Sequence, residues 1–346
     1  MFKMQVDVVV LGAHAAGQAP AVPEEVDWRS RAQVGLRVQY EWDWSHDSTM
    51  PGSGGTGFGD RGTLVDQVYT EEGDDVLGVR LVTHANFGRR TGLRFFRLLP
   101  SGELVDDAPL ESFCWQGIVS GFPPYLDFPH HDPLGKTSEL VPGLARARSV
   151  EIRDPLFHSV FPDPVPVQES VELVIPPAVQ EGFRDQPKQL QDYLEWATRS
   201  QPGSLWRTVR RSWKAQDEQG LASASGAVRL LALDDVSTIG AEGRIVERTL
   251  EFSYVNQGDP MVQTIRRTIR EVDVQSEPTD DGPSALILRD AFRLAPTDPR
   301  EACRRLTAWS CSGPGFGFWS FTEVAAQIWL LTAQAEREHA AEDRAE

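Results

Sequence analysis

Short apolar runs separated by turn residues recur in the first third of the chain. Between residues 63 and 120 these runs follow one another at intervals of roughly ten residues, which is the spacing of antiparallel strands in a meander, sandwich or barrel. The runs are Leu64–Tyr69, Val76–Thr83, Leu93–Leu99 and Phe113–Val119. The segments between them contain residues that readily adopt turn dihedrals. We therefore predict consecutive β-hairpins in this region.

A second region with a strand-like pattern runs from Gly226 to Val274. Apolar and polar residues alternate around Phe252, and the turn sequence Asn256–Pro260 follows. After the turn, Ile265 and Ile269 are separated by four residues and share one face of a strand. This arrangement predicts a second hairpin, the clearest in the chain.

Helical patterns occupy less of the sequence. Gln186–Arg199 carries an apolar stripe at helical spacing, and we predict a second helix over residues 204–215. Asp298–Glu301 and Ser320–Glu323 are capping-box sequences, so two helices are expected near the C-terminus. The apolar face of the last helix is expected to contain Phe321, Val324, Ile328 and Leu331, extended by Trp329.

Together these patterns predict an α+β fold dominated by antiparallel sheet, sandwich or meander-like, with an inserted helical segment and C-terminal helices. Composition divides the chain into a β-rich N-terminal region (1–153), a proline-rich extended connector (154–177), a helical insert (178–220) and a hairpin region followed by helices (221–346). A chain of 346 residues can also form one continuous domain.

The formal net charge of −17 argues against general binding of nucleic acid, whose phosphates attract surfaces rich in Lys and Arg. No apolar run has the length of a membrane span, and the first residues lack the pattern of a signal peptide. The three cysteines are too few for a disulfide framework and lack zinc-finger spacing. We therefore expect a soluble, acidic, cytoplasmic protein that does not bind membranes.

Four basic residues form the first candidate site: Arg207, Arg210, Arg211 and Lys214. On the predicted helix their spacing of i, i+3, i+4 and i+7 would create one basic face. Such a face on an acidic protein can hold a phosphate-bearing ligand or a carboxylate-rich partner, and we expect a protein partner or a second copy of the chain. The alternative is a solvated surface that pairs with the protein's own carboxylates.

The second candidate site is a set of possible metal ligands: His130, His131, Asp132 and His158. Imidazole and carboxylate groups bind zinc and other divalent metals, and a bound metal can activate water for hydrolysis. The flanking Pro129 and Pro133 can form the turn that two adjacent histidines need to reach one ion. This set supports the alternative of a metal-dependent hydrolase.

Two glycine-rich segments complete the candidates. Val6–Leu11 followed by Gly12–Gly17 resembles the first strand and turn of flavoprotein oxidoreductases, which implies a flavin or nicotinamide cofactor. His14 replaces the middle glycine of that motif, so the turn is degenerate. Pro51–Gly59 lacks the Gly-Lys-Ser/Thr of a phosphate-binding loop and is interpreted as a connector or a lid.

No intact catalytic signature accompanies these features. The leading hypothesis is therefore a non-catalytic binding or assembly protein that needs no cofactor. The metal-dependent hydrolase and the flavin- or nicotinamide-dependent oxidoreductase remain as alternatives.

Overall fold

The computed structural model describes residues 35–50, 55–72, 75–85, 91–98, 104–107, 114–115, 118–119, 146–152, 154–200, 205–216, 220–240, 244–276, 282–311, 319–342 and 344. The glycine-rich turn at Gly12–Gly17 lies outside these residues, and so do His130, His131 and Asp132.

The described residues form one large sheet of fourteen strands. In chain order the strands are β1 (Leu36–Thr49), β2 (Thr56–Glu72), β3 (Asp75–His84), β4 (Thr91–Leu98), β5 (Leu104–Asp106), β6 (Cys114–Trp115), β7 (Ile118–Val119), β8 (Arg146–Val150), β9 (Val165–Val174), β10 (Trp206–Lys214), β11 (Leu221–Ala222), β12 (Val228–Ile239), β13 (Ile245–Asn256) and β14 (Val262–Ser276). Their spatial order is β6-β7-β4-β3-β2-β1-β14-β13-β12-β10-β9-β8, with β5 beside β4 and β11 beside β12. Neighbouring strands are antiparallel, apart from the short parallel pair β4 and β7.

Most of the hairpins predicted from the sequence are present. β2, β3 and β4 pair consecutively, and β13 pairs with β14 through a turn in which Gly258 has φ of 81°. The run Phe113–Val119, predicted as a further strand of the series, instead contributes the short strands β6 and β7, of which β7 is parallel to β4. A positive φ is accessible to glycine at little cost, which explains this residue at the turn. The central junction joins β1 to β14, so distant parts of the chain meet in the middle of the sheet. The predicted α+β class with a dominant antiparallel sheet is confirmed.

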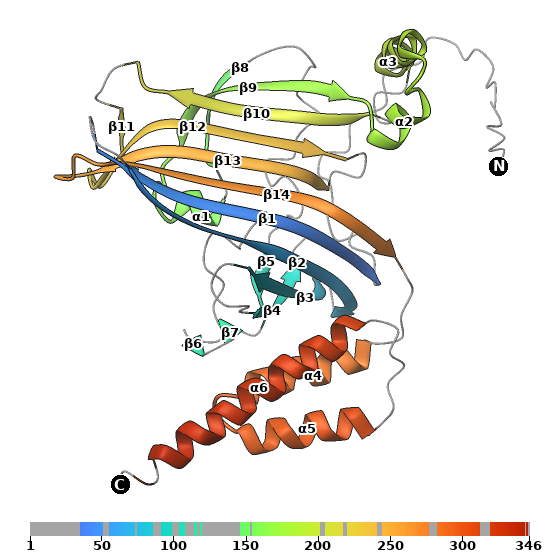
Figure 1. The fold of residues 1–346 in the computed structure, drawn as a ribbon, viewed down its shortest axis with the longest axis vertical. Coiled ribbons are helices and arrows are strands. Elements are labelled where there is room, and N and C mark those ends of the chain that lie inside the picture. The colour runs from blue at the N-terminus through green and yellow to red at the C-terminus, as the bar shows by residue number, and fades with distance from the viewer. Residues whose placement is uncertain are drawn as a thin grey trace.

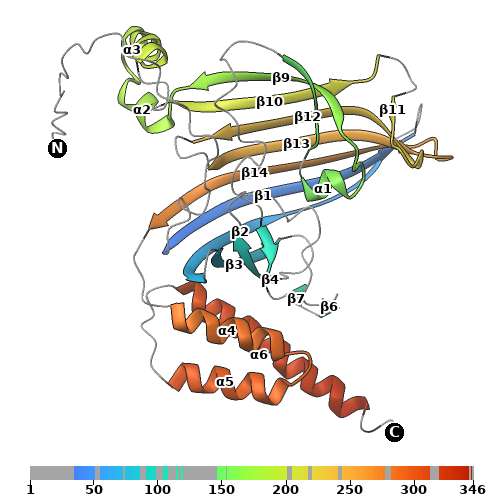
Figure 2. The same ribbon diagram turned by 180° about the vertical axis from the view of Figure 1, so that it is seen from behind.

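The two faces of the sheet are covered by different elements (Figures 1 and 2). The short helix α1 (Pro155–His158) packs on the face formed by side chains such as Tyr40 and Phe252, and we call it the α1 face. Phe157 of α1 contacts Phe252 edge-to-face, with ring centroids 5.0 Å apart. We call the opposite face the outer face. Away from the register shifts that interrupt β1, β2 and β12, neighbouring residues of a strand point to opposite faces.

Three helices cover the outer face at the β2–β4 end of the sheet (Figure 1). They are α4 (Gly282–Leu294), α5 (Pro299–Cys311) and α6 (Trp319–Glu342). Val79 of β3 and Phe95 of β4 pack among buried helical residues such as Leu288 and Ile328. Within the described part of the chain, these helices lack the combination of length and apolar character needed to cross a membrane.

The C-terminal helices agree with their capping sequences. Asp298 accepts a hydrogen bond from the Glu301 backbone N–H at 3.1 Å and caps α5. Val324 and Ile328 of α6 are buried as predicted, but Trp329 is 36% exposed and does not extend the apolar face. Helix α4 was not predicted from the sequence.

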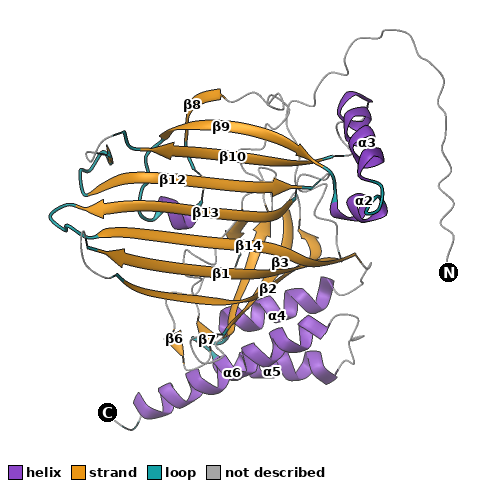
Figure 3. Cartoon of the chain, turned by 45° about the horizontal axis from the view of Figure 1, so that its top comes forward, coloured by secondary structure: helices purple, strands orange, loops and turns teal. Residues whose placement is uncertain are grey.

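The helical insert is only partly confirmed. α2 (Pro177–Gly182) and α3 (Pro187–Ser200) lie beyond one end of the long strands (Figure 3). The predicted helix over 204–215 is wrong, because Trp206–Lys214 forms β10 between β9 and β12. The physical reason is that tertiary contacts decide between two local patterns. This short segment has both helical and strand-like spacing, and it takes the conformation that allows it to pair with the neighbouring strands.

Candidate functional site

The outer face carries the candidate site. In the described part of the chain, helices α4–α6 cover this face only at the β2–β4 end, and they leave it open over β9, β10 and β12–β14. Three hollows of about 900, 520 and 550 Å³ open on it. Their linings come largely from outward-facing strand residues. The outer face is thus a broad and unevenly hollowed surface.

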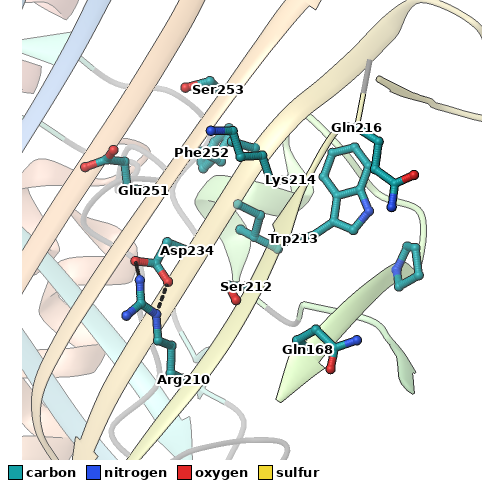
Figure 4. Close-up of a pocket in the computed structure, with 13 residues that line it drawn as sticks. Gln168, Arg210, Ser212, Trp213, Lys214, Gln216, Asp234, Glu251, Phe252 and Ser253 are labelled. Atoms are coloured by element: carbon teal, nitrogen blue, oxygen red, sulfur yellow. Dashed lines mark hydrogen bonds and ion pairs between the residues drawn. The ribbon is translucent and has the colours of Figure 1, made fainter. Parts of the chain in front are cut away.

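We call the hollow of about 900 Å³ the β10 groove (Figure 4). Strands β9, β10, β12 and β13 contribute its walls. The lining residues are Pro166, Gln168, Arg210, Ser212, Trp213, Lys214, Gln216, Ala232, Leu233, Asp234, Glu251, Phe252 and Ser253. The mixture of both charges with hydroxyl and amide groups suits hydrogen bonding to a polar partner.

Arg210 and Lys214 supply the positive charge of the groove. Arg210 forms a bidentate pair with Asp234 of β12, in which Nε and Nη2 each donate to a carboxylate oxygen at 2.8 Å (Figure 4). Both side chains remain substantially exposed, so this pair contributes little to folding stability. Lys214 is exposed and has no ion-pair or hydrogen-bond partner among the described residues. Its ammonium group is therefore available to an incoming carboxylate.

The structure separates the four basic residues that a helical spacing would place on one face. On a strand, side chains alternate with a period of two, so Arg207 and Arg211 point to the α1 face while Arg210 and Lys214 line the groove. Arg207 is half-buried, and burial lowers the pKa of its guanidinium. Arg211 is almost fully buried. The single basic face is therefore wrong, although two of its residues do share a site.

Arg211 belongs to a buried charge cluster on the α1 face. The cluster consists of three arginines and three carboxylates: Arg211, Arg248, Arg267, Asp154, Glu169 and Asp235. Arg211 Nε donates to Glu169 at 2.8 Å, and Arg248 Nε donates to Asp235 at 2.8 Å. Equal numbers of opposite charges allow the cluster to be buried without a net charge, which is the condition for tolerating charges in a core.

Asp154 links this cluster to α1. Its carboxylate caps the helix by accepting hydrogen bonds from the backbone N–H groups of Leu156 at 3.0 Å and Phe157 at 3.4 Å. The same carboxylate pairs with Arg248 at 3.0 Å and with Arg267. Burial lowers the pKa of the Arg267 guanidinium, and the negative charge of Asp154 opposes this effect. The cluster thus fixes α1 against the sheet.

Asp235 occupies the centre of the cluster. Burial by itself raises the pKa of its carboxyl, but the positive charges of Arg248 and Arg211 outweigh burial and hold the pKa below its usual range. The sequence contained a signal for this arrangement, because Arg211, Asp235 and Arg248 occupy inward positions of neighbouring strands. That signal can be recognised only once residues 206–214 are known to form a strand.

The predicted metal ligands are not brought together within the described residues. His158 ends α1 and is exposed, whereas His130, His131 and Asp132 lie outside the described ranges. Among the residues that the structure describes, no group of three or more His, Cys, Asp or Glu side chains is arranged to hold a metal ion. The metal site therefore stays a prediction.

An unpredicted histidine–aspartate pair joins β2 to β3. His84 Nδ1 lies 2.5 Å from Asp60 Oδ2, and both side chains are buried. The ring of Trp42 contacts His84 edge-to-face at 5.3 Å. An aspartate that orients a histidine also occurs in general-base catalysis. Here the buried ring is shielded from solvent, and the pair connects adjacent strands.

Comparisons with known proteins do not assign a family. No protein-family model matches the chain, and no curated protein matches it. Among solved structures, lipovitellin, in a study of its lipid–protein interactions, has 11% identity and a TM-score of 0.32, with 72% of this chain and 26% of that chain covered. The chain thus spans about a quarter of the lipovitellin chain.

Two further structures are matched over most of their length. DynF from the dynemicin biosynthesis pathway of Micromonospora chersina has 7% identity and a TM-score of 0.18, with 74% of this chain and 92% of that chain covered. A LolA superfamily protein from Nitrosomonas europaea has 7% identity and a TM-score of 0.16, with coverages of 74% and 93%. TM-scores below 0.5 do not establish a shared fold.

Proposed function

We propose that this protein is a non-catalytic binding or assembly protein that receives a protein partner on the outer face of its sheet. The observation that carries this proposal is the β10 groove, an open hollow of about 900 Å³ with an available ammonium group at Lys214. The groove is open and carries charged and hydrogen-bonding groups among its apolar ones, unlike the enclosing pockets that small molecules usually occupy. An open surface with a few fixed charges suits a protein partner, because charges across an interface select the partner and its orientation.

The chemistry of the groove defines what the partner must offer. Lys214 offers an ammonium group to a carboxylate, while Ser212, Ser253 and Gln168 offer hydrogen-bonding groups around it. Arg210 is already neutralised by Asp234, so it holds the groove's shape and adds little net charge. A segment that carries an acidic side chain flanked by polar groups therefore fits the site best.

A photo-cross-linking experiment tests the proposal. A photoreactive amino acid replaces Ser212 in the groove, and a matched chain carries the same group at Lys188 on α3, away from the groove. Irradiation in an extract of the native host is expected to give a protein adduct from position 212 that position 188 does not give. The cross-linked partner, whether another protein or a second copy of this chain, is then purified and titrated.

The titration compares the wild type with Lys214→Glu and with the control Lys188→Glu, which changes the charge equally. The groove variant is expected to bind at least about tenfold more weakly, since a like-charge contact at an interface costs several kcal/mol. The control is expected to bind like the wild type. Absence of a groove-specific adduct, or equal binding by Lys214→Glu, would overturn the proposed function.

A further inference from the structure

The outer face shows a charge pattern that is complementary to itself. Five adjacent strands, in the order β10-β12-β13-β14-β1, carry outward residues in aligned rows. The first row is Lys214, Ala232, Ser253, Thr264 and Asp47. The second row is Ser212, Asp234, Glu251, Arg266 and Ser45. The third row is Arg210, Val236, Thr249, Thr268 and Asp43.

A two-fold axis parallel to the middle strand, β13, places opposite charges against each other. A half-turn about this axis brings the outer face of a second copy against that of the first. Each row then faces the same row of the other copy, with β10 opposite β1 and β12 opposite β14. Lys214 then faces Asp47 of the second copy, and Arg210 faces Asp43. In the row between them, Asp234 of β12 faces Arg266 of β14. Such an isologous contact repeats each pair twice.

Three of the charges that this rotation sets against an opposite charge have no ion-pair partner within the described part of the chain. Lys214 on β10 has no ion-pair partner in the described part of the chain, and neither do Asp43 and Asp47 on β1. β10 and β1 are four strand spacings apart, or roughly 19 Å, so Lys214 cannot reach Asp47 in its own chain. A second copy related by this rotation would place a carboxylate opposite Lys214.

The remaining residues of the three rows are compatible with close approach. Thr249 and Ser253 of β13 lie nearest the axis, and their neighbours Thr268 and Thr264 are also small. Glu251 would face Glu251 of the second copy. In each chain, Arg266 Nε lies 3.9 Å from Glu251 Oε2, and this positive charge offsets the repulsion. Five strands of the length of β10 offer a footprint of about 700 Å² per copy, close to the ~800 Å² of a stable complex.

We propose that the outer face of the sheet is a homodimer interface in which Lys214 of each copy pairs with Asp47 of the other. This inference rests on the proposed function and names a second copy of the chain as the partner. Twisted sheets pack face to face with their strands within about 30° of each other. The dimer would be a sandwich of two sheets, with α1 and the helices α4–α6 outside the five contacting strands.

A charge-swap cycle tests the pairing. Dimerisation is measured by sedimentation equilibrium in about 0.15 M salt. The Debye length is then ~8 Å, which limits the general repulsion between two acidic chains. Lys214→Glu and Asp47→Lys are each expected to weaken dimerisation by about tenfold or more, because each creates two like-charge contacts. The double variant is expected to return to within about threefold of the wild-type Kd, since both contacts are restored with reversed sign.

The controls are Lys188→Glu and Asp192→Lys on α3, which change the charge equally away from the face. They are expected to dimerise like the wild type. Within one chain, sites ~19 Å apart contribute additively, so recovery in the double variant can arise only between copies. The inference would be overturned by a wild type that stays monomeric at a protein concentration about 100 times a micromolar Kd. It would also be overturned by a double variant that dimerises no more tightly than the single variants.

A photoreactive group at Thr249, beside the proposed axis, separates the two proposals. An adduct of two copies supports both the homodimer and the proposed function. An adduct with a different protein and none with a second copy overturns the homodimer and leaves the binding function standing. The absence of any adduct overturns both.

Discussion

The buried charge cluster makes a quantitative prediction at Asp154. Replacing Asp154 with Asn keeps an oxygen that can cap α1 but removes one negative charge, which leaves three arginines with two carboxylates. Breaking a buried ion pair by removing one partner costs about 3–5 kcal/mol. Because Arg248 keeps its bidentate contact with Asp235, at 2.8 and 3.2 Å, we expect the lower end of this range, about 3 kcal/mol.

Two further variants separate the causes of this loss. Asp154→Ala also removes the helix cap and is expected to cost about 1 kcal/mol more than Asp154→Asn. The double variant Asp154→Asn with Arg267→Met removes opposite charges together and is expected to regain much of the lost stability, because an apolar replacement of a buried pair is often neutral. The surface control Asp234→Asn, which breaks the exposed pair with Arg210, is expected to cost less than about 1 kcal/mol.

Urea unfolding followed by tryptophan fluorescence and circular dichroism measures these differences as shifts in the midpoint. If the free energy of unfolding of Asp154→Asn is within about 1 kcal/mol of the wild-type value, the cluster does not contribute the stability assigned to it. If the double variant is no more stable than Asp154→Asn alone, an uncompensated charge is not the cause.

Two other predictions concern the same sheet. The folded-state pKa of Asp235 lies below its unfolded value of about 3.9, so its ionised form stabilises the fold above that pH, and this stability is lost as the pH falls through the folded pKa. Urea midpoints measured from pH 7 to 3 should therefore decline more in the wild type than in Asp235→Asn. Parallel curves for the two proteins would contradict the assignment. A Cβ at Gly62 would lie 1.7 Å from the Thr83 carbonyl oxygen, so Gly62→Ala should force β2 and β3 apart. The free energy of unfolding should fall by about 1–3 kcal/mol or more, and the melting temperature should fall with it. The control Gly182→Ala has open space around its Cβ and should melt within a few degrees of the wild type; equal melting of both variants would refute the steric argument.

Local structure could be predicted where one pattern dominated. The turn at Asn256–Pro260 lies between two well-patterned strands, and Asp298 caps α5 as its motif predicts. At residues 204–215 two patterns competed. Arg207, Arg210, Arg211 and Lys214 fit a helical spacing, but pairing with β9 and β12 gave a strand.

That competition also determined the candidate site. The amino-acid sequence establishes that Arg210 and Lys214 are positive groups on an acidic chain, and that they lie close along it. Folding into a sheet then buried Arg211 in the core and left Lys214 on the outer face, because a strand alternates its side chains between two faces. The position of Asp47 in the same row depends on pairing between β1 and β14, which joins residues more than 200 positions apart. Local patterns cannot encode such a register, because it is fixed by which distant strands pair.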